Sequence, residues 1–316
     1  MAEIFVDEDV LASCKGKIAV IAGGANGIGA ATAVRFFHSG AHVFVSDYDD
    51  KGGIALEQSL KESATLNSGS CHFTQVNVTD YQAQVALFDL AYNKHGHVDY
   101  AVYCAGVNEM AAGGSIMSRE NTIETVKQYP KVLMDVIDIN LNGCIYFARI
   151  ALAYLGEGSD KTQPASKCLT MISSAAAFQE APGMPGYAAS KAGILAMMRA
   201  MRSGSPTMCN ARVNAICPWA TETAMTRTHN SLFKDNDIPL QGPDDVAKFI
   251  QQVTVDPKIN GRGVYVGAYR AFDIEEGLDR TLPQWLGQVN VDLWDKQAVA
   301  FSKAGDWLEP KGDTKK

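Results

Sequence analysis

The sequence lacks the features that direct a protein to polyanions or into membranes. Lysine and arginine total 28 against 35 aspartate and glutamate residues, which gives a formal net charge of −7. Because no basic cluster offsets this charge, nucleic acid and anionic membranes are disfavoured as partners. The first sixteen residues carry four acidic side chains, whereas a signal peptide starts with basic ones. We also expect no apolar run near the roughly 20 residues that cross a bilayer, and hence a cytoplasmic protein.

A disulfide framework and a metal-ligand pattern are missing as well. The seven cysteines are odd in number and scattered, which favours reduced, buried thiols. His95 and His97 form the only close histidine pair, and cysteine or carboxylate ligands do not accompany it at a useful spacing. We therefore expect no metal site.

A glycine-rich turn between a predicted strand and a predicted helix indicates a nucleotide site. Residues 17–22 form a short apolar run typical of a buried parallel strand, and residues 30–38 have helical spacing. Glycines let a pyrophosphate approach the backbone, and the helix N-terminus offers it free amides. The alternative is a turn that merely joins strand to helix. We expect the pyrophosphate to lie against Gly23, Asn26, Gly27 and Ile28.

A second predicted strand, residues 41–46, ends at Asp47. A carboxylate at this strand end suits the adenosine ribose hydroxyls and repels a 2′-phosphate. The glycine turn contains no lysine or arginine that would bind such a phosphate. The sequence therefore predicts NAD(H) as the cofactor rather than NADP(H).

A potential proton donor lies further along the chain. Tyr187 and Lys191 are four residues apart, so a helix would place them on one face. A lysine ammonium beside a phenol favours the phenolate and would lower the tyrosine pKa toward the working pH. Ser174 can donate a hydrogen bond to a substrate oxygen that gains charge.

Together these motifs resemble the short-chain dehydrogenase/reductase family. The family pattern Thr-Gly-x-x-x-Gly-x-Gly is matched at Gly23, Gly27 and Gly29, with Ala22 in place of the threonine. The resemblance covers roughly residues 15–267. It implies that Ser174, Tyr187 and Lys191 are catalytic, and that Asn140 is a fourth catalytic residue that anchors a water linked to the lysine. Residues 270–287 resemble fungal secondary-metabolism members.

The resemblance also implies further cofactor contacts. Asn77 and Val78 would lie near the adenine, and the small pair Ala105 and Gly106 would let the cofactor lie close. Tyr187 and Lys191 would reach the nicotinamide ribose. The contacts expected around the nicotinamide itself are Pro218, Trp219 and Thr223.

Four further positions depart from the family pattern. Tyr103 and Cys104 replace two asparagines, and Asn77 replaces an aspartate whose role an amide oxygen can still fill. Trp219 replaces a glycine, and we expect it either to shape an aromatic or hydrophobic substrate pocket or simply to pack the loop.

The predicted fold is α/β, a single doubly wound Rossmann-type domain. Strands and helices alternate from residue 17 to 267 without a linker, and the resemblance implies a seven-stranded, mainly parallel sheet with helices on both faces. We place this domain at 15–268, between an N-terminal segment, 1–14, and a C-terminal extension, 269–316. The expected helices are 51–65, 81–95 and 131–155, with Asn140 pointing inward. Residues 107–130 form a long insertion near the site, and 219–241 are a candidate lid or a surface loop.

The sequence predicts an NAD(H)-dependent oxidoreductase that interconverts a secondary alcohol and a ketone, acting on a hydrophobic or aromatic secondary metabolite. The alternatives are a repurposed cyclase or isomerase and a dinucleotide sensor without turnover. The helices carrying Asn140 and Tyr187 are apolar enough to pair with their copies in a homodimer or homotetramer. Because of its tryptophans, we expect the tail up to about Trp307 to fold onto its own or a neighbouring subunit, near the substrate mouth or the dimer seam.

Overall fold

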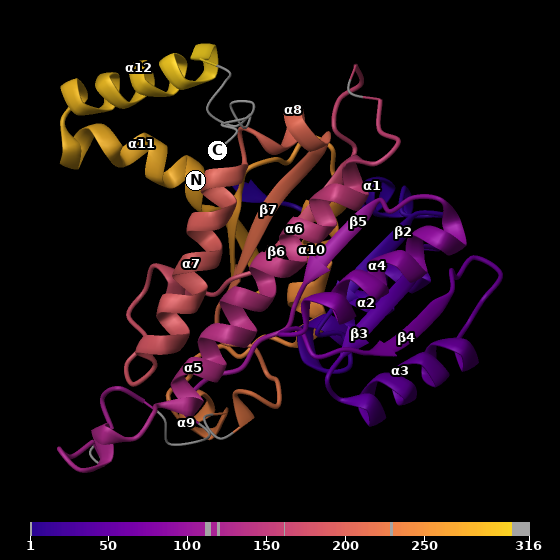
Figure 1. Ribbon diagram of the computed structural model, residues 1–316, viewed down its shortest axis with the longest axis horizontal. Helices are drawn as coiled ribbons and strands as arrows, with labels where there is room; N and C mark the ends of the chain where they lie inside the picture. Colours follow the sequence, from indigo (N-terminus) through magenta and orange to yellow (C-terminus); the bar gives the residue numbers. More distant parts are fainter. Residues whose placement is uncertain (1, 111–114, 119–120, 161, 228–229, 305–316) are drawn as a thin grey trace, which may run out of the picture.

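A nine-stranded sheet crosses the molecule in the order β1-β9-β8-β7-β6-β5-β2-β3-β4. The computed structural model describes residues 2–110, 115–118, 121–160, 162–227 and 230–304 (Figure 1). The strands are β1 (Glu3–Ile4), β2 (Ile18–Ala22), β3 (His42–Asp47), β4 (Cys71–Gln75), β5 (Tyr100–Tyr103), β6 (Lys167–Ile172), β7 (Ala211–Pro218), β8 (Gly263–Gly267) and β9 (Arg270–Asp273).

The expected seven-stranded sheet is the parallel part of this larger one, from β2 to β8. Strand β9 turns back antiparallel to β8, and the two-residue strand β1 pairs antiparallel with β9. The β8–β9 turn is made by Ala268 and Tyr269, both with positive φ, at 49° and 66°. Tight hairpins of this kind usually carry Asn-Gly or Asp-Gly, so the sequence gives no sign of this one.

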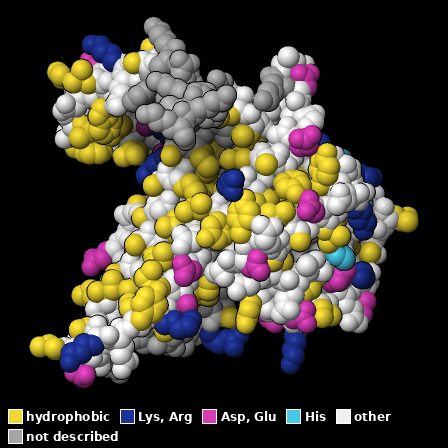
Figure 2. Space-filling view, viewed as in Figure 1, with side chains coloured by type: hydrophobic (Ala, Val, Ile, Leu, Met, Phe, Trp, Pro, Cys, Tyr) yellow, Lys and Arg dark blue, Asp and Glu magenta, His cyan; other side chains and the backbone are white. Residues whose placement is uncertain are grey.

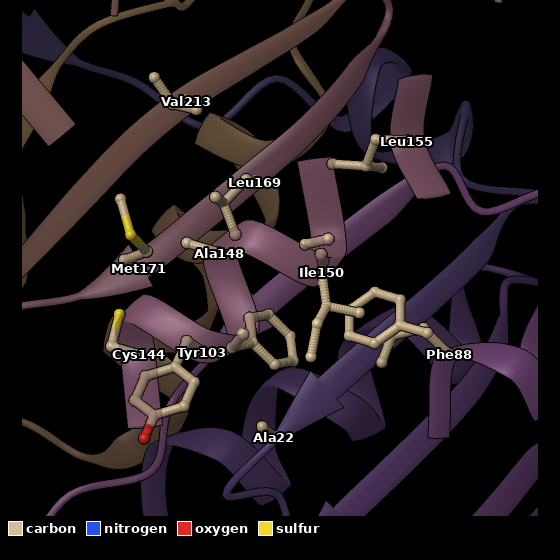
Figure 3. Packing of buried hydrophobic residues seen from close by; sticks show 14 of the residues in the cluster. Ala22, Phe88, Tyr103, Cys144, Ala148, Ile150, Leu155, Leu169, Met171 and Val213 are labelled. Carbon is tan, nitrogen blue, oxygen red and sulfur yellow. The ribbon is translucent and has the colours of Figure 1, made fainter. Parts of the chain in front are cut away.

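Helices cover both faces of the sheet, as the doubly wound fold requires. Helices α2 (Gly27–His38) and α10 (Pro243–Val255) pack together on one face, and α3 (Asp50–Glu62) lies beside β4. On the other face, α6 (Gly143–Gly156) lies between α4 (Tyr81–His95) and α8 (Ser205–Cys209), and α7 (Pro185–Met201) packs on β6 and β7. Figure 3 shows the apolar core under α4 and α6, where Phe88 and Ile150 meet side chains from the central strands.

The predicted helices form, with differences at their ends. Helix α4 has the predicted bounds, and the Asp80 side chain caps it by accepting from the amides of Gln82 and Ala83. Helix α3 ends at Glu62, three residues before the predicted end. The helix expected over residues 131–155 is divided into α5 (Lys131–Ile137), a π-helical turn η3 (Asp138–Asn142) and α6.

This divided helix corrects one expectation from the sequence. Among the described residues, the 26-residue stretch 131–156 is long and apolar enough to cross a membrane by length and composition alone, although no such run was expected. Its most apolar window is 44% buried in the fold. Packing of α6 between the sheet and its neighbouring helices accounts for this composition, because a core helix must be apolar on its buried face.

The C-terminal extension first adds β9 to the sheet, and residues 274–304 then form a helical hairpin that rises away from it (Figure 1). Helix α11 (Ile274–Leu286) is followed by α12 (Gln288–Ala304), and the two pack together. Buried Glu275 accepts from Arg199 and Arg202, so α11 is fixed to the end of α7 that lies far from Tyr187. Trp285 stays exposed, and Trp307 lies outside the described residues. Within its own chain, the described tail is therefore held away from the predicted substrate mouth.

Candidate active site

A cavity of about 1030 Å³ opens at the carboxyl ends of the parallel strands. The strand order reverses between β2 and β5, and doubly wound sheets bind ligands outside such a switch point. Every predicted site residue except Asn140 lines this cavity. The fold thus brings together residues from the glycine turn, the ends of five further strands and α7.

The glycine turn leads from β2 directly into α2. Gly23 has φ of +78°, and a side chain there would collide with the backbone of Ala105, so only glycine fits between β2 and β5. Asn26 is the N-cap residue of α2 but makes no side-chain cap bond; its amide donates to Asp49 instead. The first-turn residues of α2, Gly27, Ile28 and Gly29, line the cavity. Amides at such a helix start suit a pyrophosphate, so the residues present fit a dinucleotide.

The carboxylate of Asp47 is held at the end of β3 by two backbone amides. Ala25 donates to Oδ2 at 2.9 Å, and Asp49 donates to Oδ1 at 3.0 Å. Among the described residues that line the cavity, Lys191 is the only lysine or arginine. The adenosine end of the cavity therefore presents a fixed negative charge without a partner for a 2′-phosphate.

Asn77, predicted near the adenine, lines the same part of the cavity. Its side-chain oxygen already accepts from the amide and the hydroxyl of Thr79. The amide oxygen is therefore engaged locally, and the Asn77 side-chain nitrogen is the remaining polar group for a ligand. Its neighbour Val78 is buried and contributes apolar surface to the cavity.

The predicted proton donor and its neighbours lie at the centre of the cavity. Helix α7 places Lys191 one turn after Tyr187, with Nζ 5.6 Å from the centre of the phenol ring. Ser174 follows β6 and opens the short 3-10 helix η4 (Ala175–Ala177). Lys191 is buried, and its Nζ donates to the carbonyl of Ile172 at 2.8 Å.

The expected lowering of the Tyr187 pKa is not found in this site. Burial raises the pKa of Tyr187, and a hydrogen bond from Ser174 opposes that rise. Burial also lowers the pKa of Lys191 to about 8. Attraction between the phenolate and the ammonium would favour the charged forms, whereas removal of both groups from water favours their neutral forms.

Asn140 lies behind the cavity wall, in the π-helical turn. Its Oδ1 accepts from the Val107 amide at 2.8 Å, and its Nδ2 donates to the Val107 carbonyl and to Ser190 Oγ. The extra residue of a π turn changes the direction in which side chains point, and such turns are frequent at functional sites. Asn140 thus joins the segment after β5 to α7.

Glu109 is a site residue that the sequence analysis missed. Its side chain is fully buried, and it accepts from the amide of Gly186 at 2.8 Å and from that of Tyr187 at 3.0 Å. The sequence could have pointed to Glu109, because it is a charged residue three positions after Gly106 in a segment expected to lie near the site. Of that segment, residues 111–114 and 119–120 lie outside the described residues, and Thr125–Lys127 form a 3-10 turn.

Both apolar and polar side chains line the cavity. Trp219 follows β7 and lines it, and its amide donates to Val266. Thr223 lies across from the glycine turn, because a side chain added at Gly27 would touch its methyl group. Segment 219–241 also contains the short helix α9 (Asn230–Asp235), and its role as a lid remains a prediction. The apolar side chains around the substrate end are Met110, Met184, Trp219, Met225, Leu232 and Phe233.

No group of three or more histidine, cysteine, aspartate or glutamate side chains in the described part of the chain is placed to hold a metal ion.

The chain is similar to known oxidoreductases over most of its length. A family model described as short chain dehydrogenase matches residues 17–232. The 3-hydroxyacyl-CoA dehydrogenase type-2 of Mus musculus is 31% identical over 267 residues, which is 82% of this chain and 97% of that protein. The 5′-hydroxyaverantin dehydrogenase stcG of Emericella nidulans is 26% identical over 291 residues, which is 85% of this chain and 90% of that protein.

A solved structure of a dehydrogenase/reductase from Sinorhizobium meliloti 1021 has the same fold. It matches with a TM-score of 0.67 at 20% identity, and the match covers 82% of this chain and 98% of that chain. At this identity the likeness supports the fold alone. The predicted Rossmann-type architecture is confirmed by it.

Proposed function

The chain belongs to the short-chain dehydrogenase/reductase family, and we propose that it uses NAD(H) to interconvert a secondary alcohol and a ketone. One observation carries the proposal. Ser174, Tyr187 and Lys191 line the same cavity as the glycine turn and Asp47, so a proton donor and a dinucleotide site share one space. NAD, when bound, would accept hydride from the alcohol carbon.

Each catalytic side chain has a distinct role in this proposal. Tyr187 exchanges a proton with the substrate oxygen, and Ser174 donates a hydrogen bond to the same oxygen. Lys191 holds a positive charge near the phenol and reaches the nicotinamide ribose. Asn140 fixes the backbone at Val107, on the side of the site where Lys191 lies.

The substrate end of the cavity supports a hydrophobic or aromatic substrate. Trp219 and Phe233 contribute aromatic surface there, and Met184 and Met225 can adapt to an irregular apolar shape. The two named relatives are both dehydrogenases of hydroxylated compounds by their names, which agrees with oxidation of an alcohol.

The proposal is tested by incubating the protein with NAD and a panel of aromatic and aliphatic secondary alcohols. Formation of reduced nicotinamide, followed by absorbance, supports an oxidoreductase. Tyr187→Phe should lower the rate at least about 100-fold while NAD binding, measured by calorimetry, stays nearly unchanged. Retention of roughly a tenth of the activity would show that Tyr187 is not the proton donor. NAD binding without turnover on any substrate would favour a sensor.

We further propose that two copies pair through α6 and α7. Figure 2 shows hydrophobic side chains gathered over this side of the molecule and on the α11–α12 hairpin. Ile145 on α6 is 42% exposed, and Leu141 in the adjoining turn η3 and Met197 on α7 are partly exposed. Burial of such a face against its own copy is a common route to a two-fold dimer.

A further inference from the structure

The catalytic helix α7 begins without a cap of its own. Its N-cap residue is Met184, whose side chain makes no cap hydrogen bond. Pro185 follows at the first helical position and has no amide hydrogen, so the next two amides, Gly186 and Tyr187, need acceptors from elsewhere. The amide of Ala188 is already bonded to the carbonyl of Met184. The orphan donors therefore include the amide of the catalytic tyrosine itself.

Glu109 supplies both acceptors from a segment 77 residues away in the sequence. Its Oε1 accepts from Gly186 at 2.8 Å and its Oε2 accepts from Tyr187 at 3.0 Å. The side chain is fully buried, and among the described residues no ion pair to Glu109 is found. Burial of a carboxylate without a cation is costly, so amides at the positive end of a helix are its compensation.

Local packing leaves space for this contact. A side chain added at Gly186 would overlap Leu133 of α5 and would lie 3.3 Å from Glu109 Oε1. The absence of a side chain at Gly186 therefore lets the carboxylate reach the helix between α5 and α7. The contact joins three elements around the first turn of α7.

We propose that Glu109 is a positioning residue that caps α7 from outside and thereby fixes Tyr187 in the cavity. The inference rests on the proposed function, because it concerns the tyrosine assigned as proton donor. Glu109 does not line the cavity, so it acts through Tyr187 and not on the ligands.

The charge of Glu109 gives this role a measurable signature. The polar and charged groups around Tyr187 are Ser174 after β6, Cys217 on β7, Lys191 on α7 and Glu109, which contacts its backbone amide. Burial raises the pKa of Tyr187 most, a bond from Ser174 lowers it, and electrostatic interactions with Cys217 and Glu109 raise it further. Removal of the negative charge at Glu109 should therefore lower the pKa of Tyr187, which a purely structural role would not do.

Two variants separate the cap from the charge. Glu109→Gln keeps a side-chain oxygen for one amide but removes the charge, and Glu109→Ala removes both. Asp80→Asn is the matched control, because Asp80 caps α4 through two backbone amides as Glu109 caps α7. Titration of the Tyr187 phenol is followed by NMR with isotope-labelled tyrosine, and its signal is assigned by its loss in Tyr187→Phe. Amide exchange at the start of α7 and the pH profile of turnover are measured in parallel.

We expect Glu109→Gln to lower the pKa of Tyr187 by about half a unit to one unit, with the same shift in the pH profile. Glu109→Ala should raise amide exchange at Tyr187 roughly fivefold to tenfold and lower kcat, with little change in the KM for NAD. Asp80→Asn should change neither the titration nor exchange at α7. If Glu109→Gln leaves both the Tyr187 titration and α7 exchange as in the wild type, the inference is overturned.

The proposed function can fail separately from this inference. Absence of NAD-linked turnover in the wild type, with the expected NMR and exchange changes, would refute the reaction but uphold the link between Glu109 and Tyr187. Normal turnover in the wild type, with an unchanged Tyr187 titration and unchanged amide exchange in Glu109→Gln, would uphold the reaction but refute the link between Glu109 and Tyr187. Should Glu109→Ala fail to fold, Glu109→Gln alone decides.

Discussion

Asp47 provides the sharpest test of cofactor choice, since two variants there change its charge and its hydrogen bonds separately. Its carboxylate is fixed by the amides of Ala25 and Asp49, and no lysine or arginine among the described cavity residues lies at the adenosine end. Asp47→Asn removes the charge but keeps an oxygen for the Ala25 amide. Asp47→Ala removes both the charge and the acceptors.

The expected size of the effect follows from Coulomb's law. Two unit charges 4 Å apart interact by about 4 kcal/mol at an effective dielectric constant of about 20. Asp47 is only partly buried, so solvent and salt should reduce the repulsion of a 2′-phosphate to about 2 to 3 kcal/mol. Since about 1.4 kcal/mol is tenfold, wild type should prefer NAD over NADP by roughly 30- to 150-fold in kcat/KM.

The assay is kcat/KM with NAD and with NADP for one alcohol that the enzyme accepts. Asp47→Asn should lower the ratio of kcat/KM with NAD to kcat/KM with NADP at least about tenfold. Asp47→Ala should lower the same ratio and should also lower kcat/KM with NAD. Asp50→Asn is the matched control, because Asp50 is exposed and does not line the cavity. Equal efficiency with both cofactors in the wild type would refute the reasoning, as would an Asp47→Asn ratio that equals the wild-type ratio.

Three further predictions concern pH, the ion pair at α11 and the tail. Because burial raises the pKa of Tyr187, the phenolate needed for alcohol oxidation forms only at alkaline pH. The rate of oxidation should therefore rise, and the rate of ketone reduction should fall, as pH increases. Steady-state rates in both directions check this, and an oxidation rate that falls with pH contradicts it. Glu275→Ala leaves Arg199 and Arg202 unpaired but 35% exposed, so it should lower the free energy of unfolding by about 2 to 3 kcal/mol in urea titrations, while exposed Glu276→Ala changes it little. Truncation after Gly287 removes α12 but keeps β9 and α11 in place, and light scattering should show a smaller oligomer for the truncated protein than for the full chain. A full-length protein that is a monomer in the same experiment would contradict the pairing of α6 and α7.

Local sequence patterns determined the cofactor half of the site. The strand, glycine turn, helix and terminal Asp47 occupy one continuous segment, so their chemistry follows from spacing and backbone geometry. The same is true of Tyr187 and Lys191, which one helix places a turn apart. The parallel core of the sheet could be predicted as well, because alternating strands and helices leave few other topologies.

The tertiary structure decided the features that depend on contacts between distant segments. Glu109 meets α7 only because β5 ends and α7 begins beside the same cavity, and no local pattern encodes that meeting. The pKa of Tyr187 depends on how far the fold removes its phenol from water. Neither the spacing from Lys191 nor the neighbouring residues in the sequence indicate this degree of burial. The hairpin at Ala268 and the direction of α11 were likewise fixed by pairing with β8 and with the arginines of α7. Periodicity describes one segment at a time, whereas burial and long-range hydrogen bonds exist only once the segments have packed together.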